Sequence, residues 1–352
     1  MNYRITVLIT VLFIFTAPLF ARDKTDVLIM RNGDHMTCEV KGLSGGVLYV
    51  SFDYIDGTAS VDWSKVARVE SNQLFVVKTA DGSVYTGTIK TAETAADQPV
   101  HIQVLENPEH TAVIERSQIV KAVATSDKFW ERFNGDVSFG TIYSKGNQST
   151  QYSLGATAAY VRERWNAATT YDSSLSKSTG VTAATRNQLA ITALHLLPPN
   201  NWFYEGLGGL LQSSEQGISL QTLLGGGIGR YVKNTNQASI QLVGGAAWVN
   251  TSYQSSPEPA SRQNSAAALI YANGRFFKFS KTSLDATVIL LPFLSDPGRV
   301  RVDTNASYYI KIISNLKLNV SFYGNWDNQP PPGFSGSDYG TSSGLTWTFG
   351  LK

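Results

Sequence analysis

The chain has 352 residues and a formal net charge of +2, and only 16% of its residues are charged. This near-neutral balance excludes the strong electrostatic attraction that brings basic proteins to nucleic acid, so we expect no nucleic-acid partner. The length allows one to three domains. The low charge, 30 glycines and 11% aromatic residues favour an all-β protein.

Residues 1–21 have the organisation of a secretory signal peptide. Arg4 supplies a positive charge, residues 5–15 form an apolar run, Pro18 interrupts the run, and Ala21 occupies the expected cleavage position to within a few residues. The alternative is an uncleaved anchor helix, which the short length of the run disfavours. We therefore expect an exported chain without a transmembrane helix. The single cysteine, Cys38, excludes an intramolecular disulfide.

Residues 23–127 are expected to form a small periplasmic β-domain built from two repeats. DVLIMRNGDHMTCEV is echoed by QLFVVKTADGSVYTGTI, so that Gly33 corresponds to Gly82. Later, VDWSKVARVES is echoed by IERSQIVKAVAT, so that Val66 corresponds to Ile119. Each repeat predicts a strand, an NGD or ADG turn, two more strands and a short closing strand. Two copies are too few for a solenoid and predict two bent sheets packed together, followed by a junction at residues 128–134.

Residues 135–352 are predicted to form an outer-membrane antiparallel β-barrel of about 12 strands. In LKLNVSFYGNW, the apolar Val320 and Phe322 alternate with the polar Asn319 and Ser321. A soluble sandwich would turn the polar face outward, whereas a membrane barrel turns the apolar face to lipid. Short and longer connections alternate along this half, which is typical of the membrane barrel. With an even number of strands, the first strand begins and the last strand ends on the short-turn side, which is the periplasmic side.

The alternation also assigns individual side chains to the two faces of the barrel. The candidate lumen-facing residues are Arg301, Asp303, Lys311, Lys317, Asn319 and Asn325. The candidate lipid-facing or girdle residues are Trp165, Trp202, Phe322, Trp326, Trp347 and Phe349. Other aromatic residues near the short turns, among them Phe203, Tyr204, Tyr231, Phe276, Phe277 and Phe279, are assigned to the same girdle. Glycines blur the alternation around Glu205 and Arg230, whose faces stay open.

The lumen charges allow two interpretations. They could pair with one another and fill a narrow barrel, or they could line a small selective pore. We favour the filled barrel, because about twelve strands leave a slim interior once side chains occupy it.

The chain ends on the alternating strand SGLTWTFGLK, in which Trp347 and Phe349 share a face. This strand resembles the C-terminal signal that the outer-membrane assembly machinery reads. The expected partners are therefore that machinery, outer-membrane lipid, and a periplasmic partner of residues 23–127.

The start of the barrel half, GDVSFGTIYSKGNQSTQYSLGATAAYV, carries a family resemblance. Its glycine-flanked strand (Gly135, Gly140), its loop (Ser144, Gly146, Asn147) and the amphipathic strand that follows resemble the uncharacterised family of salt-induced outer-membrane proteins. The resemblance covers about residues 135–351. It implies an outer-membrane location and a barrel fold, and it implies no biochemical activity.

We find no motif for catalysis, a cofactor or a metal. Of the four histidines, only His195 lies in the barrel half, and it is not followed by the serine of a His-x-Ser pair. No His, Cys and Asp cluster has metal-ligand spacing, and the GGGIG stretch at 225–229 precedes no helix. We predict a non-enzymatic barrel with a structural or envelope-adaptation role and at most a narrow pore. The alternatives are a small-solute channel with a partner-docking periplasmic domain and, less favoured, an outer-membrane hydrolase.

Overall fold

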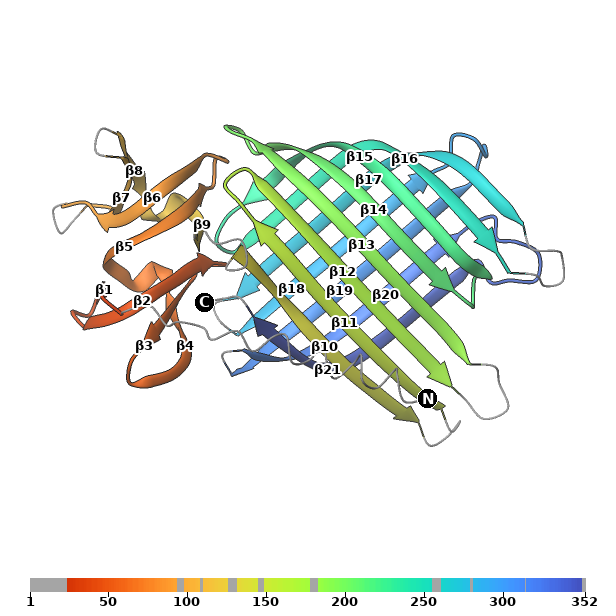
Figure 1. Cartoon of the computed structure of the whole chain (residues 1–352), viewed down its shortest axis with the longest axis horizontal. Coiled ribbons are helices and arrows are strands. Elements are labelled where there is room, and N and C mark those ends of the chain that lie inside the picture. Colours follow the sequence, from red (N-terminus) through yellow and green to blue (C-terminus); the bar gives the residue numbers. More distant parts are fainter. Residues whose placement is uncertain are drawn as a thin grey trace, which may run out of the picture.

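A computed structural model describes residues 24–93, 98–107, 110–125, 132–144, 149–177, 183–254, 261–278, 281–313 and 315–349. The strands form two separate sheets, a nine-stranded sheet and a closed barrel (Figure 1). The expected signal peptide, Phe279 and most of the expected junction lie outside the described residues. Within the described residues, no helix has both the length and the apolar character needed to cross a membrane.

The first sheet, which we call the β-domain, comprises residues 24–125. Its strands are β1 (Asp26–Met30), β2 (His35–Ser44), β3 (Val47–Phe52), β4 (Ile55–Asp62), β5 (Val66–Thr79), β6 (Val84–Thr91), β7 (His101–Asn107), β8 (His110–Glu115) and β9 (Ile119–Ala124). Short 3-10 helices, η1 (Trp63–Lys65) and η2 (Arg116–Gln118), precede β5 and β9. The strand order is β4-β3-β2-β1-β5-β6-β7-β8, and β9 pairs with both β2 and β5.

The two repeats fold alike, and the closing strand of each repeat also pairs with a strand of the other. The first part of β5 closes the first repeat against β1 and continues onto β6 of the second, where Glu70 pairs with Lys90. Strand β9 closes the second repeat against β5 and also pairs with β2 of the first, where Leu43 faces Ala122. The expected pair of packed sheets is therefore one curled, barrel-like sheet. The exchange of closing strands is the reason, because it joins both repeats by hydrogen bonds.

The inside of the curled sheet is an apolar core shared by both repeats. Its central members include Leu28, Val50, Phe75, Ile102 and Val104, all fully or almost fully buried. Cys38 also lies in this core. Burial, together with Asp26 and Glu39, raises the pKa of the Cys38 thiol to about 12, so the thiol stays protonated.

The second sheet is a closed antiparallel barrel of twelve strands, which confirms the predicted fold class. The strands are β10 (Phe133–Ser144), β11 (Ser149–Val161), β12 (Trp165–Lys177), β13 (Ala184–Leu197), β14 (Trp202–Ser213), β15 (Ile218–Asn234), β16 (Ala238–Tyr253), β17 (Arg262–Lys278), β18 (Thr282–Pro292), β19 (Val300–Ile313), β20 (Leu316–Asp327) and β21 (Ser337–Phe349). Each pairs with the next, and β21 closes the barrel against β10, with Phe349 opposite Gly135.

The two ends of the barrel differ in their connections. At the short-turn end the strands are joined by residues 162–164, 198–201, 235–237, 279–281 and 314–315. At the other end, the long-loop end, the connections include 254–261, 293–299 and 328–336. Strand β10 begins and β21 ends at the short-turn end, and the β-domain lies there too (Figure 1).

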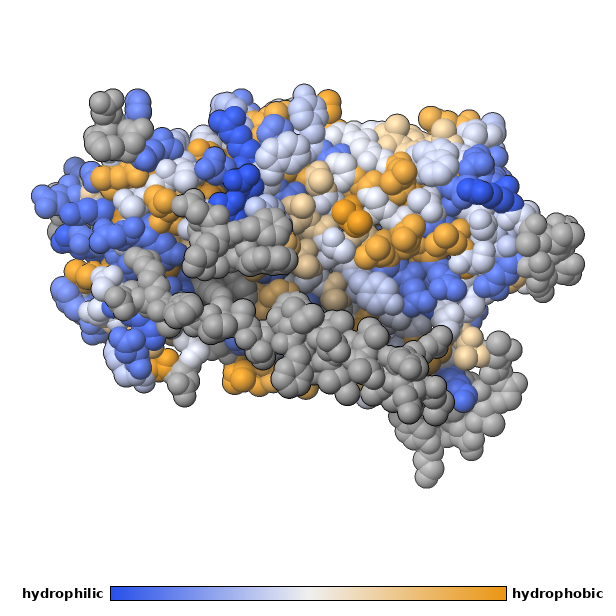
Figure 2. Space-filling view, in the orientation of Figure 1, coloured by the Kyte–Doolittle hydropathy of each residue, from blue (hydrophilic) through white to orange (hydrophobic). Residues whose placement is uncertain are grey.

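The outer face of the barrel is apolar. Side chains two residues apart along each strand are exposed, such as Val137 and Phe139 in β10, and Val320 and Phe322 in β20. Figure 2 shows apolar residues gathered along the visible side of the barrel, whereas the surface of the β-domain is mostly hydrophilic. An apolar surface on a closed barrel is the arrangement that a hydrocarbon environment requires, because every backbone hydrogen bond is made between strands.

Candidate functional site

The structure places the candidate lumen and lipid residues on opposite faces of the barrel. Arg301, Asp303, Asn319 and Asn325 are buried on the inner face, and Lys311 and Lys317 are half-buried there. On the outer face, the exposed side chains are those of Trp165, Trp202, Phe322, Trp326 and Trp347, and Phe349 is half-buried beside Trp347.

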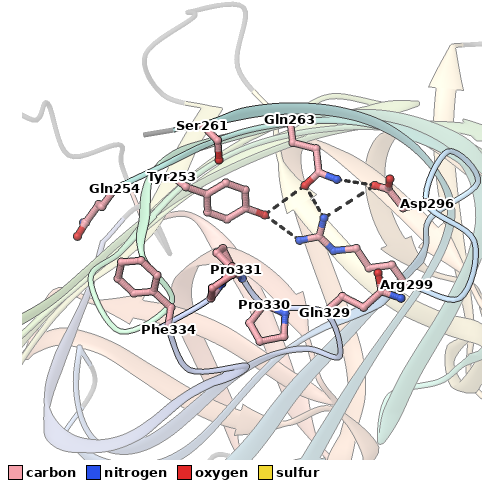
Figure 3. Close-up of a pocket in the computed structure, with 11 residues that line it drawn as sticks. Tyr253, Gln254, Ser261, Gln263, Asp296, Arg299, Gln329, Pro330, Pro331 and Phe334 are labelled. Carbon is pink, nitrogen blue, oxygen red and sulfur yellow. Dashed lines mark hydrogen bonds and ion pairs between the residues drawn. The ribbon is translucent and has the colours of Figure 1, made fainter. Parts of the chain in front are cut away.

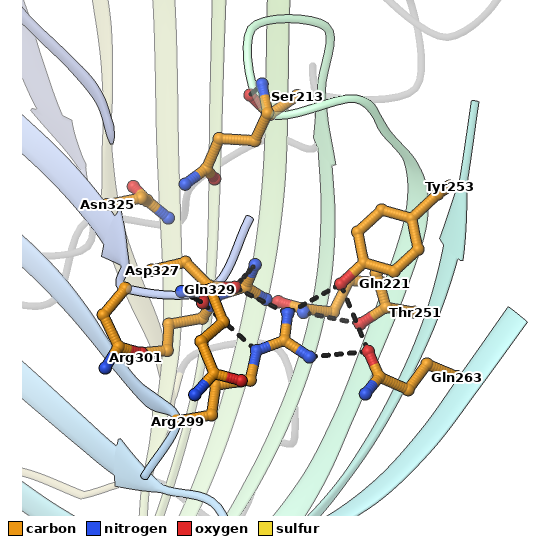
Figure 4. A network of polar contacts seen from close by, with 12 residues as sticks. Ser213, Gln221, Thr251, Tyr253, Gln263, Arg299, Arg301, Asn325, Asp327 and Gln329 are labelled. Carbon is orange, nitrogen blue, oxygen red and sulfur yellow. Dashed lines mark hydrogen bonds and ion pairs between the residues drawn. The ribbon is translucent and has the colours of Figure 1, made fainter. Parts of the chain in front are cut away.

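A buried arginine–aspartate network crosses the lumen near the long-loop end (Figure 4). Arg299 donates two hydrogen bonds to Asp327, from Nε to Oδ1 at 3.1 Å and from Nη2 to Oδ2 at 2.7 Å. Arg301 adds a third to Oδ2 at 3.0 Å. Arg299 also donates to the Tyr253 hydroxyl at 2.7 Å and to Gln263. Bidentate arginine–carboxylate geometry holds these strand ends in a fixed arrangement.

A second arm of this network joins the opposite walls of the barrel. Arg186 of β13 donates to the side-chain oxygen of Asn325 in β20 at 2.9 Å. Its guanidinium carbon also lies 4.4 Å from the ring centroid of Tyr323. Asn325 in turn donates to Asp303 at 2.8 Å. The structure thus brings the predicted Arg301, Asp303 and Asn325 into one region.

Sequence reasoning missed three members of the network: Arg186, Arg299 and Asp327. A charged residue inside an amphipathic strand is the signal that could have identified Arg186. Arg299 precedes β19 and Asp327 ends β20, and at strand ends the alternation assigns no face.

Strands β14–β18 supply an apolar inner wall. Leu207, Val249, Leu269 and Leu291 pack together there with Phe293. A neighbouring cluster consists of Leu194, Leu196, Phe203, Val243 and Tyr271. The lumen is therefore amphipathic, with a packed apolar wall on one side and the charged network on the other.

The girdle assignment was wrong for Phe203, Tyr231 and Phe277. Phe277 lies on the same face of β17 as the buried Tyr271, and its ring packs against Gly45 of the β-domain. Phe203 is fully buried on the inner face, and its ring centroid lies 5.0 Å from that of Tyr231. Strand periodicity explains this, because Phe203 alternates with Trp202 and Tyr204, which are exposed outside. Gly229 makes room for the inward ring, since a Cβ at Gly229 would collide with it.

The structure also settles the faces of residues that the alternation left open. Glu205 is buried on the inner face, whereas Arg230 lies outside, with its guanidinium carbon 5.5 Å from the ring centroid of Trp202. His195 stacks on Trp165, with ring centroids 4.4 Å apart. His195 therefore lies beside Trp165 on the outer face of the barrel.

Two cavities open near the long-loop end. The first, of about 260 Å³, is lined by Arg299, Gln263, Tyr253 and the prolines of the β20–β21 loop, with Phe334 at its edge (Figure 3). The second, of about 270 Å³, is lined by Arg186, Glu215, Tyr323, Asp338 and several serines. Neither lining contains a histidine or a cysteine. In the described part of the chain, no group of three or more His, Cys, Asp and Glu side chains could hold a metal ion.

The β-domain is docked on the short-turn end through asparagines of the barrel turns. The hydrogen bonds run from Asn200 N to Asp81 O (2.9 Å), Asn201 Nδ2 to Ala80 O (2.8 Å), Asn234 Nδ2 to Thr79 O (3.2 Å) and Asn236 Nδ2 to Ile119 O (2.9 Å). Val84 of the β-domain packs against the inner cluster around Phe203. The domain thus contacts both the rim and the interior of this barrel mouth.

A close approach at Gly82 makes this docking possible. Gly82 has a φ of +90°, close to the +92° of its counterpart Gly33, and a Cβ at Gly82 would lie 2.5 Å from the backbone nitrogen of Asn201. Two features of the turn therefore require glycine at this position: its left-handed backbone and the close approach of the barrel.

The family described as "Protein of unknown function, DUF481" matches residues 137–349. No curated protein matches the chain. That family description does not mention salt, so the resemblance to salt-induced outer-membrane proteins stays an expectation from the sequence.

Several solved structures are similar to part of this chain. They include the translocator domain of the autotransporter NalP from Neisseria meningitidis (14% identity, TM-score 0.36, covering 62% of this chain and 88% of that one). The NanC porin (11% identity, TM-score 0.39, covering 61% and 100%) and the COG4313 outer membrane channel from Pseudomonas putida F1 (13% identity, TM-score 0.37, covering 62% and 95%) are similar too.

Proposed function

The chain belongs to the DUF481 family, described as being of unknown function, and we propose that it is a non-enzymatic outer-membrane barrel with a sealed lumen and a structural or envelope-adaptation role. The filled interior carries this proposal. Arg301, Phe203, Leu269 and Leu291 all point inward and are at most 1% exposed. Side chains packed to that degree behave as a core and leave no wide aqueous path.

The proposed location rests on the surface of the barrel. Its exposed apolar side chains suit hydrocarbon, and Trp165, Trp202 and Trp347 near the short-turn end suit a membrane interface. We place the short turns, and with them the β-domain, in the periplasm. The proposed partners are outer-membrane lipid, the assembly machinery acting on β21, and a periplasmic protein bound by the β-domain.

The second candidate is a small-solute channel in which the β-domain is a docking module or gate. Two observations favour it: the polar cavities at the long-loop end, and the charged wall that continues inward from them. In this alternative the docked β-domain would close the periplasmic mouth.

Conductance recordings in planar bilayers separate the two functions. For a sealed barrel we expect no unit steps from the full chain, and none after Asn201→Ala, Asn234→Ala and Asn236→Ala together loosen the β-domain. Asn328→Ala is the matched control, because its amide donates to Gly298 O at the opposite end, at 2.8 Å. Unit steps from the full chain, or from the triple variant alone, would instead support the channel.

A further inference from the structure

Two lysines of the β-domain point into the mouth of the barrel. Lys78 in β5 and Lys121 in β9 are direct cross-strand partners, so their side chains leave the sheet on the same face. Lys78 is only 9% exposed, and its Nζ lies 3.5 Å from the side-chain oxygen of Asn166 in β12. Lys121 experiences the positive charge of Arg275 in β17. Both ammonium groups therefore face the junction between the β-domain and the barrel.

In the part of the chain that the structure describes, this lysine pair has no carboxylate partner. Among the described residues, neither ammonium has a carboxylate within 4.0 Å. Arg275 does not neutralise the lysines, because it is itself a cation. It is paired with Asp285 at 2.6 Å. Burial and then Lys121 lower the pKa of Lys78 to about 7, and burial and then Arg275 lower the pKa of Lys121 to about 8. Lys78 is almost buried and Lys121 is partly buried, and like charges placed directly opposite each other in this way oppose docking unless an anion joins them.

The internal repeat provides a built-in comparison. Applying the repeat correspondence, Ile29 and Arg68 occupy the positions of Lys78 and Lys121, and they too are cross-strand partners. There only one of the two residues is cationic. Arg68 is substantially exposed and pairs with Glu70 at 2.5 Å.

The second repeat has one more cation than the first and lacks the acidic residue of the first. Val123 stands where the first copy has Glu70, so the carboxylate that neutralises Arg68 has no counterpart beside Lys121. The copy that faces solvent thus carries a satisfied ion pair, whereas the two lysines of the copy that faces the barrel have no carboxylate partner among the described residues. This difference in charge between the repeats lies at the docking surface. The fold that both repeats share does not require it.

From this contrast we propose that Lys78 and Lys121 form a binding site for a phosphate group at the junction of the β-domain and the barrel. A phosphate has several acceptor oxygens and a charge that two ammonium groups can share, and lysine binds it as a point charge. The bound anion would join β5, β9 and the barrel mouth and so stabilise the docked arrangement. The phosphate group could belong to a soluble phosphate or to a lipid headgroup.

The test uses the full chain, folded in detergent micelles in a phosphate-free buffer and titrated with inorganic phosphate by calorimetry. We expect saturable binding that weakens at least about tenfold in the Lys78→Met, Lys121→Met double variant, because each charge-assisted hydrogen bond contributes that much. Methionine keeps the apolar stem of each side chain, so the core contacts remain. Arg68→Met is the matched control at the equivalent position and should bind phosphate as the native chain does.

A second arm distinguishes the two sources of the phosphate group. The chain and its variants are reconstituted in phosphatidylcholine vesicles with or without phosphatidylglycerol, and lipid retained on extraction is counted by native mass spectrometry. Retention of phosphatidylglycerol that depends on both lysines, without binding of inorganic phosphate, assigns the site to a lipid headgroup. The proposal is overturned if neither probe binds, or if the double variant and the native chain bind equally. The heat-dependent gel shift of a folded barrel confirms that each variant has folded.

Discussion

The β-domain and the barrel have the same two-residue period but bury opposite faces. In the β-domain the apolar set points inward, with Leu28, Val50 and Phe75 fully buried. In the barrel the apolar set points outward, with Val320 and Phe322 exposed. The comparison teaches that alternation identifies a strand, whereas the medium beside it, water or lipid, decides which face is apolar.

The largest expected effect comes from making the same substitution in both regions. Phe75→Ala should cost the β-domain about 3–5 kcal/mol, because it leaves a cavity in a closed core. Phe322→Ala, on the exposed face of β20, should cost the barrel clearly less. Hydrogen exchange of the β5 and β20 amides measures both losses. Equal losses would mean that Phe322 belongs to a packed core and not to a lipid-facing surface.

A charge placed at two depths tests the outer face directly. Val320→Arg, near the middle of β20, should lower the unfolding free energy by about 2–4 kcal/mol in lipid vesicles. Val232→Arg, near the short-turn end of β15, should lower it by about 0–1 kcal/mol, because an arginine there reaches the interface. Urea titration of the folded barrel gives both values. Similar costs at the two positions would contradict the proposed membrane embedding.

Two equivalent glycines separate folding of the β-domain from its docking. Gly33 and Gly82 have φ values of +92° and +90°, so alanine should destabilise either turn by about 1–2 kcal/mol. A Cβ at Gly33 would meet nothing within 4 Å, whereas one at Gly82 would strike Asn201. Only Gly82→Ala should therefore speed hydrogen exchange of the Asn200 amide, which bonds to Asp81. Equal exchange in both variants would show that the docking does not depend on this approach.

The pH dependence of docking tests the burial of Lys78 and Lys121 without any substitution. The docked pKa values of Lys78 and Lys121, about 7 and about 8, lie below those of exposed lysines. A lowered pKa means that docking is weakest when both are charged, and that it strengthens as the pH rises from about 7 towards 10 in phosphate-free buffer. Each lysine contributes at most about 1.4 kcal/mol per pH unit.

Exchange of the Asn200 amide, corrected for the intrinsic effect of pH, measures this change in docking. The Lys78→Met, Lys121→Met variant should lose most of the dependence. Docking that weakens with rising pH would contradict the burial of these lysines.

Most of the candidate residues could be placed on a face from the sequence because their strands alternate cleanly. Trp165, Phe322 and Arg301 lie in such strands, and a single parity assigns them. Phe203 was misassigned because its aromatic character was weighed above its parity. Arg299 and Asp327 could not be placed, since both lie at strand ends, where the backbone leaves the pleat.

The all-β class, the alternation of short and long connections and the internal repeat can be inferred from the order of residues along the chain, because each is a pattern in that order. The folded molecule is needed to show that Arg186 reaches Asn325 across the lumen, and that Lys78 and Lys121 meet at the barrel mouth. Those contacts join segments far apart in the chain. They exist only once the barrel has closed and the β-domain has docked, and no local pattern of residues specifies that geometry.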